Sequence, residues 1–108
     1  MVNAPAPRRG EVWWYEHPDA GRRPFVVLTR SEAAEVLHQV MAAPATRTVR
    51  AIPTEVPLDE RDGMPTDCVV NLDNVTLVRT ALLTERITTL DPSRIAACCT
   101  ALAIATDC

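Results

Sequence analysis

Two short segments of this sequence carry residue types that can bind a phosphate. Arg22 and Arg23 come directly before Pro24 and an apolar run, and Thr46 follows a second apolar run. An arginine at the start of one strand and a threonine at the end of its neighbour can lie at the same rim of a barrel. The guanidinium fork of arginine fits a phosphate, and the threonine hydroxyl can donate or accept a hydrogen bond. By residue type alone the pair is compatible with a phosphate site, although arginine and threonine are common at strand ends.

The sequence contains no conventional pattern for a cofactor or a metal. It lacks GxGxxG and GxxxxGK[ST] loops, an HExxH motif and a CxxC pair, and its two histidines, His17 and His38, do not cluster with cysteines. We therefore expect no nucleotide cofactor and no metal ion. Because the chain shows no export signal, we interpret its four cysteines as small core residues or free thiols: Cys68, Cys98, Cys99 and Cys108.

Short β-strands must position these groups. Aromatic and β-branched residues predict a first strand at 11–15 and an apolar run predicts a second at 24–29, with a polar loop over 16–23 between them. Pro44 is expected to end the third strand, and two prolines make the fourth an edge or bulged strand. The third to seventh strands are predicted at 40–43, 51–58, 68–72, 75–78 and 86–90.

Two helical segments complete the predicted fold. Ser31 can cap a short helical turn over 31–37, and Asp91 followed by Pro92 is typical of the start of a helix. The stripe of this C-terminal helix that should face the sheet consists of Ile95, Cys98, Cys99, Leu102 and Ala105. The predicted fold class is therefore mainly β with minor α: a small, curved, partly open β-barrel with a C-terminal helix.

Length and charge restrict the class of protein further. The 108 residues suit one domain, with residues 1–8 as a loose N-terminal arm. Because no apolar run could span a bilayer or act as a signal peptide, we expect a cytoplasmic protein. All eleven basic residues are arginines; seven stand among the first 50 residues with five acids, and four stand in the remainder with nine acids. Any anion site must therefore use arginine, mostly from the first half.

Four blocks of the sequence have a recognisable order and spacing. They are RGEVWW at 9–14, GRRPFVVL at 21–28, APAT at 43–46 and TDCVV at 66–70. In these blocks, and in the ERI and LDP segments that precede the C-terminal helix, the chain resembles the MazF/PemK family of toxin endoribonucleases. The resemblance extends over about residues 8–105, which is nearly the whole chain.

The resemblance implies a fold, an activity and partners. The fold is a curved β-barrel with a C-terminal helix, usually a homodimer, and a MazE-like antitoxin inhibits it. The activity is metal-independent cleavage of single-stranded RNA, in which the 2′-hydroxyl of the substrate attacks the adjacent phosphate and leaves a cyclic phosphate and a 5′-hydroxyl. The substrate can be a messenger RNA, a ribosomal RNA or a transfer RNA loop. The catalytic arginine and threonine of the family fall on Arg23 and Thr46.

The general base and the other RNA contacts remain open at this stage. Many relatives have a longer loop after the first strand, with an acidic residue near the cleavage site, which makes Glu16 and Asp19 candidates for the base. His17 is a third candidate because imidazole titrates near neutral pH. The predicted RNA-binding residues are Arg22, Arg47 and Arg50.

Two other functions are compatible with the same fold, since a fold does not set the function. One is a non-enzymatic, CcdB-like toxin that binds and poisons a protein target such as DNA gyrase. The other is an RNA-binding module without catalytic activity, which would bind RNA in a salt-sensitive way and release no products. Cleavage of RNA by the purified protein, and its dependence on Arg23, distinguishes these hypotheses.

Overall fold

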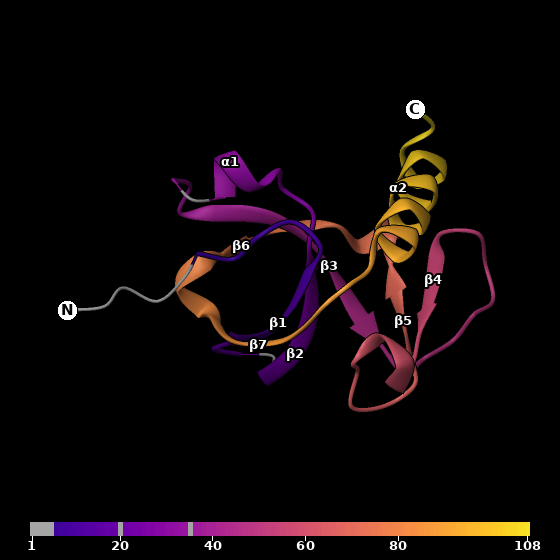
Figure 1. The fold of residues 1–108 in the computed structure, drawn as a ribbon, viewed down its shortest axis with the longest axis horizontal. Helices are drawn as coiled ribbons and strands as arrows, with labels where there is room; N and C mark the ends of the chain where they lie inside the picture. The colour runs from indigo at the N-terminus through magenta and orange to yellow at the C-terminus, as the bar shows by residue number, and fades with distance from the viewer. Residues whose placement is uncertain (1–5, 20, 35) are drawn as a thin grey trace.

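Seven antiparallel strands form one curved sheet, and a long helix packs beside it (Figure 1). The computed structural model describes residues 6–19, 21–34 and 36–108. In chain order the strands are β1 (Glu11–His17), β2 (Gly21–Val27), β3 (Gln39–Thr46), β4 (Glu55–Leu58), β5 (Cys68–Asn71), β6 (Thr76–Arg79) and β7 (Leu83–Thr89). Their pairing order is β4–β5–β3–β2–β1–β7, and β6 also pairs with β3.

The sheet curves without closing into a complete barrel. Within the described ranges, β4 and β7 stand at the two ends of the pairing order and do not pair with each other. Helix α2 (Pro92–Thr106) packs against β4 and the 3₁₀ turn η2 (Leu72–Asn74), whereas α1 (Ser31–Ala34) is a single turn. The predicted fold class, mainly β with a partly open barrel and a C-terminal helix, is confirmed. No helix in the described part of the chain is long and apolar enough to cross a membrane.

Strand β3 connects the two parts of the sheet. Its residues 39–42 pair with β6, its residues 42–44 pair with β2, and its last two residues, Ala45 and Thr46, pair with β5. The prediction that this strand ends at Pro44 is wrong. A proline has no N–H to offer a neighbouring strand, but Pro44 stands where β3 leaves β2 and joins β5, so a missing donor is tolerated there. Thr46 is consequently held in a strand.

The β1–β2 connection is a tight hairpin. The two strands stay paired up to Gly21, and Glu16 lies opposite Arg22. Gly21 has a φ of +79°, a left-handed conformation that glycine adopts without steric cost. The loop predicted over 16–23 is therefore mostly strand. Exposed polar residues can continue the backbone pairing that the apolar parts of the two strands form. Arg22 and Arg23 are thus fixed in β2.

Strand β4 starts later than predicted because the Glu55 side chain, and not a neighbouring strand, accepts the backbone hydrogen bonds just before it. The Glu55 Oε1 atom accepts hydrogen bonds from the backbone N–H groups of Arg50 (2.9 Å) and Ala51 (3.0 Å). Ala51 has a φ of +55°, which turns the chain away from an extended path. The predicted strand over 51–58 therefore begins only at Glu55, and the preceding residues form a loop.

The N-terminal arm is anchored at its described end. Residues 1–5 of the arm predicted over 1–8 lie outside the described residues. Pro7 is buried, and the backbone N–H of Arg8 donates a hydrogen bond to the Glu11 carboxylate at 2.7 Å. The last residues of the arm are therefore packed on the domain instead of being loose.

Glu11 is a buried carboxylate with partners on both oxygens. Its Oε1 atom accepts the Arg8 backbone N–H and the Trp13 indole N–H (3.0 Å), and its Oε2 atom accepts the Arg86 guanidinium (3.2 Å). Its side chain is only 8% exposed. Burial of a charge is tolerated when it is paired and hydrogen-bonded, so Glu11 joins the start of the domain to β1 and β7.

Helix α2 begins at Pro92, as predicted. The Asp91 side chain accepts hydrogen bonds from the Ser93 hydroxyl and the Arg94 backbone N–H. These bonds lower the pKa of Asp91, the hydroxyl contributing most. A depressed carboxylate pKa means that the cap stabilises the folded state above the unfolded pKa and that this stabilisation is lost as the pH falls through the folded value.

The buried face of α2 covers one of two core clusters. Cys98 and Ala101 are buried there, together with sheet residues that include Val12 and Val70. Cys99 was predicted on the same face but is exposed, and its Sγ atom accepts a hydrogen bond from the Arg9 guanidinium at 3.0 Å. All four cysteines are free thiols.

We expect the native protein to have two rapidly reacting thiols. Cys99 and Cys108 are exposed, whereas Cys68 and Cys98 are buried, and burial raises the pKa of Cys68 and raises that of Cys98 to about 11. Since the thiolate is the reactive form, the buried pair should react slowly. Titration with a chromogenic disulfide reagent should count two fast thiols, and four after denaturation. The Cys99→Ser variant should show one, and four fast thiols in the native wild type would contradict this packing.

Candidate active site

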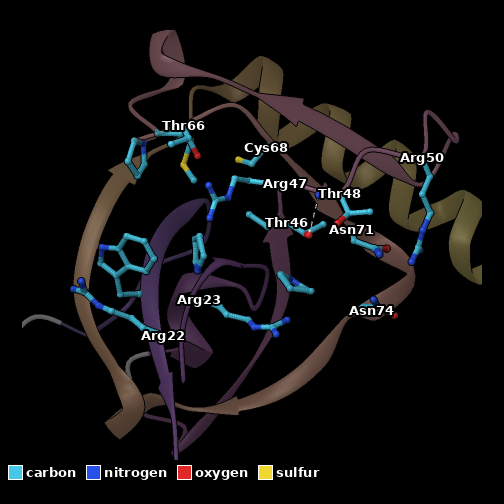
Figure 2. Close-up of a pocket in the computed structure, with 16 residues that line it drawn as sticks. Arg22, Arg23, Thr46, Arg47, Thr48, Arg50, Thr66, Cys68, Asn71 and Asn74 are labelled. Carbon is cyan, nitrogen blue, oxygen red and sulfur yellow. Dashed lines mark hydrogen bonds between the residues drawn. The ribbon is translucent and has the colours of Figure 1, made fainter. Parts of the chain in front are cut away.

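A groove opens on the sheet beyond the last paired residues of β2 and β3 (Figure 2). Its volume is about 820 Å³, and strands β1, β2, β3 and β5 contribute to its lining with the loop after β3. Among the described residues that line it there is no carboxylate and no imidazole. Four arginines line it: Arg22, Arg23, Arg47 and Arg50. The groove is therefore suited to an anionic ligand.

The register of β2 and β3 brings Arg23 and Thr46 to matching positions. The two strands pair as far as Phe25 and Pro44. Continuing that register by two residues places Arg23 opposite Thr46. A proline stands in each strand at this point, Pro24 and Pro44, and neither offers an N–H to its neighbour. The strands can separate here, and both side chains line the space between them.

Arg23 and Thr46 present complementary donors to the groove. The Arg23 side chain makes no ion pair or hydrogen bond with any residue that the structure describes. The Thr46 Oγ1 atom accepts the backbone N–H of Thr48 at 3.2 Å, which leaves the hydroxyl hydrogen free to donate. A permanent positive charge and a neutral O–H donor thus stand at the same site.

The other three arginines differ in how far their charge is neutralised. The Arg22 guanidinium bonds to Glu85 at 2.8 Å. Arg47 and Arg50 follow β3, and their guanidinium groups have no carboxylate partner within the described ranges. In Figure 2, Arg22 lies at one side of the groove and Arg50 at the other, with Arg23 between them. All three residues predicted to bind RNA line the groove.

Comparison with known proteins identifies the family. Residues 8–106 match the model of the PemK-like, MazF-like toxins of type II toxin–antitoxin systems. The chain belongs to this family. It is 46% identical over 103 residues to the probable endoribonuclease MazF5 of Mycobacterium tuberculosis, covering 94% of each chain. It is 43% identical to the probable endoribonuclease MazF2 of the same organism, covering 94% of this chain and 99% of that one.

Solved MazF structures have the same fold. An endoribonuclease from a mycobacterial species, in complex with its cognate antitoxin, superposes with a TM-score of 0.86 at 27% identity, covering 94% of this chain and 96% of that one. The Mycobacterium tuberculosis toxin MazF-mt6 superposes with a TM-score of 0.83 at 32% identity, covering 90% and 96%. The resemblance read from the four sequence blocks is confirmed.

The three candidates for a general base do not line the groove of this MazF-family protein. Glu16, His17 and Asp19 are exposed at the end of the β1–β2 hairpin. The His17 Nδ1 atom accepts the backbone N–H of Asp19 at 3.0 Å. The two strands stay paired up to Gly21. The choice of a base among these three residues stays a prediction, which cleavage by variants would test.

Several polar residues of the groove were missed from the sequence. Asn71 is 3% exposed, and its Oδ1 atom accepts the backbone N–H of Asp73 at 2.9 Å. Its Nδ2 group has no partner among the described residues and is available as a donor on the groove wall. Thr48 and Thr66 add hydroxyls. A polar residue that ends the apolar run at 68–70 was the one signal that could have identified Asn71.

Proposed function

We propose that this MazF-family endoribonuclease cleaves single-stranded RNA in the groove between Arg23 and Thr46. The 2′-hydroxyl oxygen of the substrate attacks the adjacent phosphorus, and the bond to the 5′-oxygen of the next nucleotide breaks. The products are a cyclic phosphate and a 5′-hydroxyl. One observation carries the proposal: an unpaired arginine and a donor hydroxyl stand at matching strand positions in an arginine-lined groove.

The proposed catalysis rests on charge stabilisation and positioning. Negative charge accumulates on the non-bridging oxygens as the phosphorus becomes five-coordinate, and donors already fixed at those oxygens stabilise the transition state most. Arg23 provides the charge and Thr46 a hydrogen bond to a second oxygen. Because the nucleophile belongs to the substrate, the protein mainly imposes in-line geometry. No side chain is assigned as the base or the acid: the 2′-hydroxyl proton passes to water, and the departing 5′-oxygen takes a proton from water.

Replacing His17 with glutamine is expected to change the cleavage rate less than about twofold, because a base must come within hydrogen-bond reach of the proton that it removes. His17 is exposed on the hairpin and does not line the groove. Single-turnover cleavage of one RNA between pH 5.5 and 8.5 would measure this effect. A loss of a hundredfold across this pH range would make His17 the base.

The partners follow from family membership and from the charge of the groove. We propose that a cognate antitoxin, MazE-like in type, covers the groove with an acidic segment that pairs with Arg23, Arg47 and Arg50. We also propose that the chain is one domain, acts as a homodimer and works in the cytoplasm on messenger, ribosomal or transfer RNA. A monomer in light scattering at working concentration would contradict the dimer.

The experiment that tests the function is digestion of a mixed RNA pool by the purified protein in EDTA. Discrete cuts that carry cyclic phosphate and 5′-hydroxyl ends are expected, and mapping these ends gives the recognition sequence. Cuts that disappear in EDTA would overturn the metal-independent reaction. If a folded protein makes no cuts and captures a protein target from lysate, the non-enzymatic toxin replaces this proposal.

A further inference from the structure

Three neighbouring strands build a layered arrangement at one side of the groove. Trp14 on β1 lies directly opposite Glu85 on β7. On its other side Trp14 lies opposite Pro24 on β2, so Arg22, two residues before Pro24, shares the same face of the sheet. The Arg22 Cζ atom lies 4.4 Å from the centroid of the Trp14 ring, and its Nη2 atom donates to Glu85 at 2.8 Å.

The arrangement holds the Arg22 guanidinium in place. The indole ring supports it from one side, and the carboxylate fixes its Nη2 end. The Arg22 side chain is still 47% exposed, and both Trp14 and Arg22 line the groove. One surface of a flat cation is therefore covered by the ring while the residue remains accessible from the groove.

Arg22 and its neighbour Arg23 differ in whether a carboxylate neutralises their charge. Glu85 compensates Arg22, whereas Arg23 has no carboxylate partner among the described residues. A phosphate-binding arginine works best with its full charge and its fork free. A guanidinium that lies over an aromatic ring and is already paired is better suited to stacking, and single-stranded RNA bases stack on aromatic rings and on arginine planes.

We propose that Arg22, supported by Trp14 and held by Glu85, is a stacking platform for one nucleobase of the bound RNA at this side of the groove. This inference rests on the proposed RNA cleavage and gives Arg22, which was predicted to bind RNA, a role in sequence preference. Arg22 precedes Arg23 in β2, but the two side chains extend in opposite directions from the strand, and Arg22 lies at one side of the groove (Figure 2). The stacked base therefore belongs to a nucleotide bound at that side of the groove.

The test compares cut-site profiles on a randomised single-stranded RNA pool. Arg22→Lys keeps the charge and removes the flat surface, and Trp14→Leu removes the support. Both variants are expected to lose the base preference at the same single position and to lower kcat/KM about tenfold, the scale of one lost stacking contact. Arg61→Lys makes the same change at an exposed arginine that does not line the groove, and as the matched control it should keep the sequence profile of the wild type.

The outcomes separate the platform from the function on which it rests. An unchanged profile in Arg22→Lys would overturn the platform, as would losses at different positions in the two variants, while wild-type cuts would leave the proposed function standing. No cuts by the wild type would overturn both. A thermal melt of Trp14→Leu checks that this variant folds, and the exposed Arg22→Lys provides the result if it does not.

Discussion

Replacing Arg23 with alanine is expected to lower the single-turnover cleavage rate by about 10³-fold, the scale of losing an arginine that stabilises a phosphoryl transition state. The Arg23 side chain is exposed and has no partner among the described residues, so the substitution removes no native contact. Its backbone remains in β2 opposite Tyr15. The melting temperature should therefore stay close to that of the wild type.

The controls for this prediction are in the same chain. Arg61→Ala removes an exposed arginine that does not line the groove, and it should leave the rate within about twofold because it touches neither the substrate nor its binding surface. Thr46→Val, which removes one hydroxyl donor, should cost about a hundredfold. Rates would be measured at saturating protein with a single RNA. A rate for Arg23→Ala within tenfold of the wild type would exclude Arg23 as the catalytic cation.

Replacing Glu11 with alanine is expected to lower the free energy of unfolding by about 3 kcal/mol, because several donors lose a buried partner at once. The Arg8 backbone N–H, the Trp13 indole and the Arg86 guanidinium all point at this carboxylate. With a side chain only 8% exposed, water cannot easily take its place. Urea unfolding followed by tryptophan fluorescence would measure the change.

A second variant separates the hydrogen bonds of Glu11 from its charge, and a variant of an exposed acid serves as the control. Glu11→Gln keeps an acceptor for the backbone and indole donors, so it should be less destabilising than Glu11→Ala. Glu60→Gln neutralises an exposed acid and should stay within about 0.5 kcal/mol of the wild type. A loss below about 1 kcal/mol in Glu11→Ala would mean that the three donors find other partners.

The parts of the fold that depend only on residues close together in the sequence were predictable. The Asp91 cap followed by Pro92 placed the start of α2, since both signals act within one turn. The errors lie where a distant partner compensates a local signal. Pro44 would end an isolated strand, but here it marks the change of partner from β2 to β5. The Glu55 carboxylate similarly takes the N–H groups that a longer β4 would have used.

The candidate site was predictable to the extent that it lies within single sequence blocks. Arg23 and Thr46 follow from the family resemblance, and the strand register brings them to matching positions. Trp14 reaches the groove because β1 lies between β2 and β7 in the sheet. The pattern of residues within β1 alone does not reveal this pairing. The three base candidates lie outside the groove lining for a related reason, because the length of the hairpin depends on pairing between strands.

The pairing of β3 with β5 also determines when the Thr46 side of the groove forms during synthesis of the chain. Thr46 pairs with Val69 on β5, so a nascent chain that ends before that strand lacks the neighbour that holds the hydroxyl in place. Pairings between residues so far apart in the chain form late in folding. The Thr46 hydroxyl is therefore held in the groove only after β5 has been synthesised and has paired with β3.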